Sequence, residues 1–151
     1  MAAAGGTENL TLVRSRVEDR LFAEPYSFEF MQAVRLLRQF HPEREGVGLF
    51  RMPSHEVVRF GVNPSLSFPA SQIQELESRE DAPPLFRVNF MGTVGPLGIL
   101  PVYYTELVAA RVFYRDRTLR DFLDLFHHRI ISLFYLAWQK YRFIVGFEQG
   151  E

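Results

Sequence analysis

Gly92-Thr93-Val94-Gly95-Pro96-Leu97-Gly98-Ile99-Leu100-Pro101 constrains the backbone more tightly than any other part of this 151-residue chain. Three glycines and two prolines in ten residues select backbone conformations, because glycine opens left-handed dihedral angles and proline fixes φ. Partial apolar–polar alternation over 85–90 predicts a strand before this stretch, and Pro101 suits the first turn of a helix running to about Arg115. We therefore predict a rigid structural loop built on Gly92, Gly95, Pro96, Gly98 and Pro101.

A glycine-rich loop between a strand and a helix also occurs in nucleotide-binding sites. The alternative function is therefore a small nucleotide-binding enzyme or regulator that uses the Gly92–Gly98 loop. The spacing is G-x-x-G-x-x-G, not G-x-G-x-x-G, and no Lys-Ser or Lys-Thr pair follows it. Pro96 and Pro101 also lack the backbone donors that a phosphate cradle would use. These departures favour the structural loop over a cofactor-binding site.

Two helices are expected before the loop. An apolar stripe at helical spacing (Leu10, Val13, Val17 and Leu21) predicts a short amphipathic helix that ends before Pro25. The stripe is narrow, which suits packing on its own domain or on a partner. Ser27 is a candidate N-cap for a second helix over 28–40. Its expected inward side chains are Phe30, Ala33, Val34, Leu37 and Phe40.

The middle of the chain predicts short strands separated by loops. Residues 41–54 contain two glycines and two prolines, which is typical of a loop. Val57–Phe60 and Leu66–Phe68 are strand candidates, and the alternation noted above makes Leu85–Phe90 a third. Gln72–Arg79 is expected to form a helical turn.

A long helix is expected from Thr118 to about Arg142, with Thr118 as its cap and Asp121 completing a capping-box-like arrangement. Its apolar residues cover most of the circumference. A helix of that kind must be covered on nearly all sides. Missing chain or partner subunits are therefore expected to cover it. The polar strip is narrow and lies near Arg120, Asp124, His128 and Gln139.

Candidate chemistry is sparse. Asp124 and His128 are spaced i, i+4 on one helix face, as two metal ligands could be, but His41 and His55 lie in remote loops and the chain has no cysteine. A polar helix strip is the favoured interpretation, and no nucleophile motif is present. We therefore assign no catalytic, cofactor-binding or metal-binding residue. Net charge is −1 and no apolar run approaches 20 residues, which disfavours nucleic-acid binding and direct membrane insertion.

Four segments, taken in order, point to one family. They are FEFMQAVRLLR at 28–38 with Pro42, RF at 59–60 followed by PSLSFP at 64–69, FMG at 90–92 with GPLGILP at 95–101 and TE at 105–106, and FLDLFHHR at 122–129 with LFY and AW at 133–138. Together they resemble the TssG (ImpH/VasB) family of type VI secretion baseplate proteins. Any one would be weak evidence. Four in order, over about residues 25 to 142, are specific.

The resemblance implies a non-enzymatic scaffold in the cytoplasm, within a baseplate docked at the inner-membrane complex. TssF is the implied wedge partner, with TssK, TssE and VgrG elsewhere in the baseplate. Family members run to about twice this length, so the chain is expected to lack the family's C-terminal half. Contacts to TssK lie largely in that half, which makes TssF the safer expectation.

The expected fold class is α+β, with amphipathic N-terminal helices, a small sheet of short strands and a long, largely apolar C-terminal helix. Residues 1–24 are expected to form an N-terminal arm and short helix, and residues 25–151 a TssG-like domain. The expected partner-facing residues are the stripe Leu10, Val13, Val17 and Leu21, with Phe134 and Trp138 of the long helix. Aromatic residues on an apolar helix more often belong to a core, so a core position is the alternative for Phe134 and Trp138.

Overall fold

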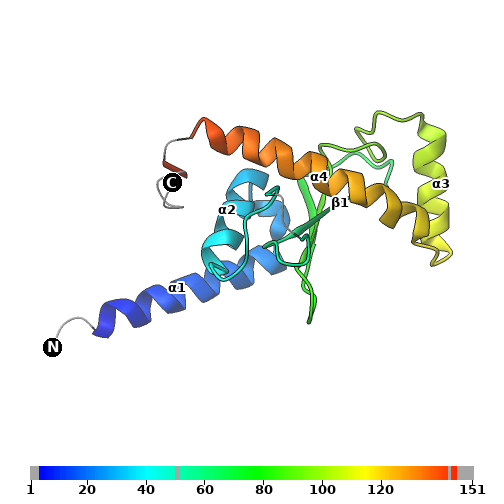
Figure 1. The fold of residues 1–151 in the computed structure, drawn as a ribbon. Coiled ribbons are helices and arrows are strands. Elements are labelled where there is room, and N and C mark those ends of the chain that lie inside the picture. Colours follow the sequence, from blue (N-terminus) through cyan, green and yellow to red (C-terminus); the bar gives the residue numbers. More distant parts are fainter. Residues whose placement is uncertain (1–3, 50–51, 143, 146–151) are drawn as a thin grey trace.

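The structure, a computed structural model, describes residues 4–49, 52–142 and 144–145, and the side chains of 4–10 lie outside this description. Four helices and a small sheet confirm the predicted α+β class and the long C-terminal helix (Figure 1). The elements are α1 (Ala4–Ala23), the short 3-10 helix η1 (Pro25–Ser27), α2 (Phe30–Phe40), β1 (Arg59–Val62), β2 (Ile73–Glu77), β3 (Leu85–Val88), α3 (Val102–Phe113) and α4 (Thr118–Lys140).

The sheet has the strand order β1-β3-β2. β1 runs parallel to β3, with Phe60 opposite Phe86, and β2 runs antiparallel to β3, with Leu76 also opposite Phe86. All four residues of β3 are buried, as expected for the central strand. β1 is therefore an edge strand, and one row of its backbone groups needs partners from outside the sheet.

A cluster of phenylalanines joins α2 to one face of the sheet. The ring of Phe30 lies 5.5 Å from that of Phe60, 5.6 Å from that of Phe86 and 5.0 Å from that of Phe90. Aromatic rings at these separations add favourable ring–ring contacts to the area they bury. The predicted inward face of α2 is confirmed for Phe30, Ala33, Val34 and Leu37, whereas Phe40 is only partly buried.

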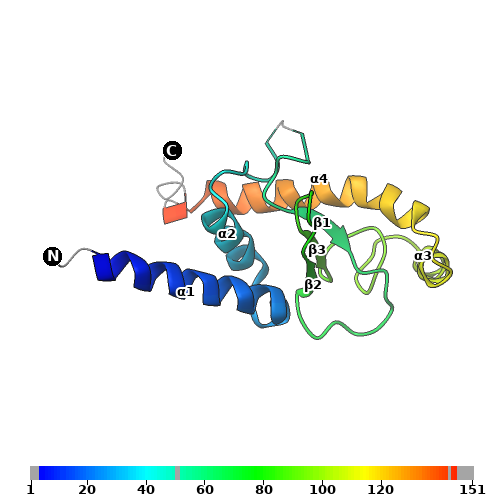
Figure 2. The same ribbon diagram turned by 90° about the horizontal axis from the view of Figure 1, so that it is seen from below.

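The first helix is longer than expected because it begins at Ala4. α1 lies beside α2 (Figure 2), where the guanidinium of Arg14 donates to the carbonyl oxygen of Gln39 and stacks 5.6 Å from the ring centre of Phe40. Near its other end, Leu21 is fully buried in the same core as α2 and the sheet. The C-terminal half of α1 is thus packed against the rest of the chain.

Several local predictions are wrong. Gln72–Arg79 holds strand β2 and not a helical turn, because Leu76 and its neighbours pair with β3, and such pairing overrides weak local preference. The strand expected at Val57–Phe60 is β1 at Arg59–Val62, and Leu66–Phe68 is irregular. Ser27 ends η1, where its hydroxyl donates to the carbonyl oxygen of Glu24, and it does not cap α2.

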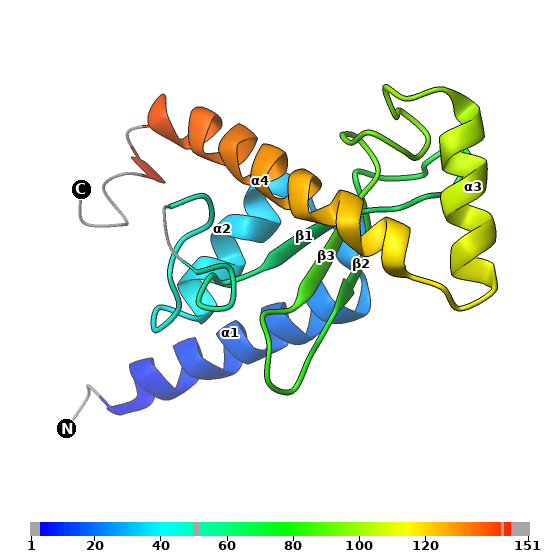
Figure 3. The ribbon, with the colours of Figure 1, turned by 45° about the vertical axis from the view of Figure 1, so that its right-hand side comes forward.

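The start of α4 also differs from the prediction. Thr118 is the first helical residue, and the preceding position carries no side-chain cap. The backbone N–H of Thr118 donates to Asp116 Oδ1 at 3.1 Å, so a carboxylate outside the helix accepts from the first backbone donor of α4. From this start α4 runs across the molecule over β1, and α3 stands apart from α2 near the N-terminal end of α4 (Figures 1 and 3).

Candidate interaction surface

Helix α4 presents two opposite stripes of side chains. The inward stripe is polar at its N-terminal end and recurs at intervals of three or four residues, the spacing of one helix face. It consists of Asp124, His127, His128, Ile131, Ser132 and Tyr135. Of the predicted polar strip, Asp124 and His128 belong to this inward stripe and face the sheet, whereas Arg120 and Gln139 do not belong to it.

The inward stripe reaches the free edge of β1. Arg59 N–H donates to the carbonyl oxygen of Pro84 at 2.9 Å and Asn63 N–H to that of Val88 at 3.1 Å, so odd-numbered residues of this segment pair with the β3 side. Because strand N–H groups alternate in direction, the N–H groups of residues 60 and 62 point to the free edge.

Two α4 side chains accept from those edge groups. His128 Nδ1 accepts from Phe60 N–H at 3.1 Å, and Asp124 Oδ1 accepts from Val62 N–H at 3.2 Å. An unpaired buried N–H costs free energy, so these bonds allow α4 to cover the edge without that penalty. Helix α4 thus occupies the place that another strand would take.

A glycine and a buried arginine let α4 approach this closely. A Cβ atom on Gly61 would lie 2.8 Å from Asp124 Oδ2, so the position has no room for a side chain. Arg87, in β3, places Nε 2.7 Å from Glu75 Oε1 and Nη1 3.5 Å from Asp124 Oδ2. Its buried charge therefore sits between two carboxylates, an arrangement that buried guanidinium groups require.

His128 also connects α4 to the loop before β1. Since its Nδ1 accepts from a backbone N–H, its proton is assigned to Nε2, which lies 2.8 Å from Glu56 Oε2 without forming a hydrogen bond to it. Glu56 Oε1 accepts from Gly48 N–H at 3.2 Å, and Arg129 Nη1 donates to Gly48 O at 2.8 Å. The Glu56 carboxylate and His128 line a pocket of about 340 Å³, yet each holds backbone in place.

His127 connects α4 to the glycine-rich loop. Its Nε2 accepts from Thr93 N–H at 3.0 Å and contacts the Thr93 hydroxyl at 2.7 Å. The other ring nitrogen, Nδ1, donates to Asp124 Oδ1 at 2.9 Å. One carboxylate therefore orients His127 and binds β1 at the same time.

The loop itself is held from several sides. Gly95 has φ of 102°, and a Cβ atom there would lie 2.5 Å from Asn63 O, so only glycine fits. Its N–H donates to the buried hydroxyl of Thr105 in α3 at 3.1 Å. A Cβ on Gly92 or Gly98 would also approach neighbouring atoms to 2.7 Å.

Five backbone donors of this loop are used within the protein. These donors, each with an acceptor in the protein, are the N–H groups of Thr93, Gly95, Gly98, Ile99 and Leu100. A phosphate would have to displace these bonds, which favours the structural loop over the nucleotide-binding alternative. Pro101 immediately precedes α3, so it lies one position outside the predicted first turn. Among the described residues, no three His, Asp or Glu side chains converge to hold a metal ion.

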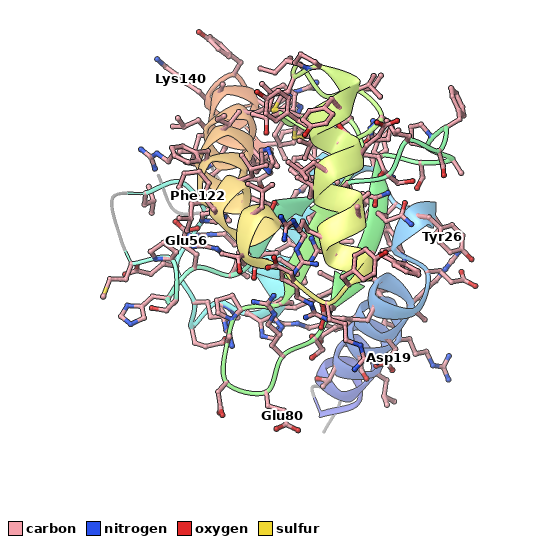
Figure 4. The ribbon with its side chains drawn as sticks, turned by 90° about the vertical axis from the view of Figure 1, so that its right-hand side faces the viewer. Asp19, Tyr26, Glu56, Glu80, Phe122 and Lys140 are labelled. Carbon is pink, nitrogen blue, oxygen red and sulfur yellow. The ribbon has the colours of Figure 1, made fainter. Side chains whose placement is uncertain are left out.

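The outward stripe of α4 is apolar. Its six large side chains, each 40% to 55% exposed, recur at the same three- and four-residue intervals as the inward stripe. They are Phe122, Leu125, Phe126, Ile130, Leu133 and Phe134, here called the outer stripe. The rings of Phe122 and Phe126 meet edge to face at 5.4 Å, and Figure 4 shows Phe122 on the side of α4 away from α3. A contiguous exposed apolar surface of this kind is typical of a protein–protein contact.

The sequence prediction found only part of this surface. Phe134 belongs to the outer stripe, whereas Trp138 is half-buried against the core, with the Tyr135 ring at 5.8 Å and the Arg142 guanidinium at 5.5 Å. The other five members were missed as a surface because the helix was expected to be apolar nearly all round. Their spacing opposite Asp124 and His128 separates two faces of the helix, although it does not say which face lies inward.

The N-terminal stripe divides between surface and core. Val13 is 58% exposed, Val17 is half-buried and Leu21 is 0% exposed. Leu10 lies outside the described side chains. The expected partner-facing role of Leu21 is therefore corrected, because its side chain packs entirely inside this chain.

Comparison with known proteins identifies the protein family. The family model described as "Type VI secretion, TssG" matches residues 24–151, so the chain belongs to the TssG family of type VI secretion components. No match was found among curated proteins or among solved structures. In the part of the chain that the structure describes, no helix combines the length and apolar character needed to cross a bilayer.

Proposed function

We propose that this chain is a structural scaffold of the type VI secretion baseplate, where it forms the wedge with TssF and supports assembly of the contractile tail. In this proposal the protein acts in the cytoplasm, in a baseplate docked at the inner-membrane complex. TssK, TssE and VgrG are its neighbours within that assembly. It works through protein–protein contact, without catalysis and without a cofactor.

The outer stripe of α4 carries the proposal. A surface helix normally turns its polar side to water and its apolar side to the core. Here the polar residues Asp124, His127 and His128 are bonded to the chain's own backbone, and aromatic and aliphatic side chains face outward. Covering the exposed half of each large apolar side chain contributes roughly 1 kcal/mol. A partner that covers all six would gain a substantial contact.

The inward bonds keep the outer stripe in place. Because α4 is fixed to β1 and to the glycine-rich loop, the stripe is a rigid surface that loses little conformational freedom on binding. We assign the main TssF contact to the outer stripe, including Phe134. Val13 and Val17 of α1, together with Leu10, form a second candidate contact.

The test is co-expression with the cognate TssF, followed by size-exclusion chromatography with light scattering. We expect a co-eluting complex. The variant Phe126→Asp/Ile130→Asp should weaken it by about 100-fold or more, because each substitution places a charge in an apolar contact. Met52→Asp is the matched control, since Met52 is a similarly exposed apolar residue outside α4 and its variant should bind normally.

Circular dichroism of both variants must match that of the unaltered protein, so that loss of binding is not loss of folding. Normal TssF binding by the folded double variant would remove the outer stripe from the interface. If a well-folded TssF did not bind the unaltered chain, the proposed wedge role would be overturned.

A further inference from the structure

The C-terminal end of α3 closes with two characteristic backbone bonds. Arg115 N–H donates to Val112 O at 2.9 Å, and Asp116 N–H donates to Arg111 O at 2.9 Å. These are the 5→2 and 6→1 bonds of a Schellman motif, which places Arg115 at the C′ position. That position requires the left-handed conformation, and Arg115 has φ of 63°.

An arginine is an unusual choice at C′. Glycine is usual there because it lacks the Cβ atom that crowds the left-handed conformation. Among the described residues, Arg115 is the one non-glycine residue with positive φ. Strained backbone conformations of this kind are concentrated at functional sites, so the side chain of Arg115 is a candidate for a role outside folding.

The surroundings of Arg115 leave its charge unbalanced. Of the four arginines between 111 and 120, Arg111 lies 3.6 Å from Asp116 and Arg120 lies 2.8 Å from Asp121. The other two, Arg115 and Arg117, are exposed, and within the described structure their side chains make no ion pair or hydrogen bond. The turn between α3 and α4 therefore presents two free guanidinium groups.

Two aromatic rings flank these charges. Phe113 and Tyr114 are 81% and 79% exposed, and their rings meet edge to face at 5.5 Å. We call Phe113, Tyr114, Arg115 and Arg117 the α3–α4 corner. It lies at the opposite end of the molecule from the start of α1 (Figures 1 and 3).

We infer that the α3–α4 corner docks an acidic segment of another protein. Guanidinium groups bind carboxylates through two parallel hydrogen bonds, and the neighbouring rings would cover apolar side chains of the same segment. Two free cations on a chain of net charge −1 are too few for the salt-sensitive phosphate contacts of a nucleic acid or for an anionic membrane. The inference concerns residues outside the outer stripe and does not depend on TssF.

The test uses the full chain and two fluorescein-labelled probes. One is a 16-residue peptide of Glu, Leu and Phe, and the other carries Gln in place of every Glu. Fluorescence anisotropy should show binding of the acidic peptide that weakens at least threefold between 50 and 300 mM NaCl, because exposed charge pairs are screened by salt. The Gln peptide should bind at least tenfold more weakly.

Arg115→Gly separates folding from binding. This variant should have a higher melting temperature, because glycine relieves the backbone strain. Its affinity for the acidic peptide should be about threefold lower or more. The affinity of the double variant Arg115→Gly/Arg117→Gln for the acidic peptide should be about tenfold lower. Arg79→Gln, which removes an exposed arginine from another surface, is the control and should leave binding unchanged.

Several results would overturn the inference. They are a lower melting temperature for Arg115→Gly, unchanged binding by the double variant, equal binding of the two peptides, and no binding of the acidic peptide at all. The inference would also be overturned if the chain bound a single-stranded RNA 20-mer or phosphatidylserine vesicles in place of the peptide and this binding depended on Arg115. The corner would then belong to another class of ligand.

Discussion

Phe60 N–H donates to His128 Nδ1 at 3.1 Å, across 68 positions of sequence. This bond, with the one from Val62 N–H to Asp124 four residues earlier on α4, fixes a helix along the open edge of a β-sheet. The polar side of α4 is used inside the molecule as a result, and its apolar side is left outside. Edge protection and the exposure of an apolar surface are thus linked in one helix.

Removing the Asp124 carboxylate should strongly destabilise the fold. Asp124→Ala leaves the N–H of Val62 without its acceptor and removes a carboxylate from beside the buried charge of Arg87, so the free energy of unfolding should fall by about 3 kcal/mol. Urea denaturation followed by circular dichroism measures the loss. Asp121→Ala, at an exposed carboxylate of the same helix, should cost less than about 0.5 kcal/mol. Equal stability of the two variants would contradict the buried role of Asp124.

A side chain at Gly95 should damage the glycine-rich loop. Gly95→Val forces a β-branched residue to φ of 102° and brings its Cβ to 2.5 Å from Asn63 O, so stability should fall by about 3 kcal/mol and assembly with it. Thermal unfolding and co-elution with TssF are the measurements. Leu97→Ala in the same loop, at an exposed side chain, should change stability by less than about 0.5 kcal/mol. A stable, TssF-competent Gly95→Val protein would refute this account of the loop.

The two ends of the N-terminal stripe should behave differently. Leu21→Ala empties a fully buried position and should cost about 3 kcal/mol, whereas Val13→Ala alters an exposed one and should stay within about 0.5 kcal/mol. Denaturant titration of both variants measures the contrast. Comparable small losses at both positions would mean that the end of α1 does not belong to the core.

Asp116 should titrate below the 3.8 of an unperturbed aspartate. Hydrogen bonding to Thr118, by its side chain and its backbone N–H, lowers the pKa of Asp116 most, and the nearby charge of Arg111 lowers it further. The carboxylate is therefore bound better in the folded state. Its stabilising contribution is complete above about pH 4 and is lost as the pH falls through the lower folded value. Carboxyl carbon shifts followed by NMR give the titration, and Thr118→Ala should move the pKa of Asp116 back upward.

The family, the fold class and much of the α2 core followed from the sequence because they depend on local patterns. Phe30, Ala33, Val34 and Leu37 recur at helical spacing, and the glycines and prolines of 92–101 limit the backbone wherever they occur. The residues that form strand β2 did not follow, because its own apolar residues show no clear strand period and its pairing with β3 defines it as a strand. The capping roles expected of Ser27 and Thr118 were wrong, because both residues donate hydrogen bonds to preceding residues. The Ser27 hydroxyl donates to Glu24 O, and the Thr118 N–H donates to Asp116 Oδ1.

By itself, the sequence determined that α4 would be long and carry both apolar and polar residues, because helical spacing and capping act within a few positions. Only the tertiary structure decided which side of α4 faces inward. The free N–H groups of β1 lie 62 to 68 positions from the side chains that bind them, so no local pattern indicates that Asp124 and His128 belong inside. Unpaired backbone groups at the sheet edge made the polar side the inner one and left the outer stripe exposed.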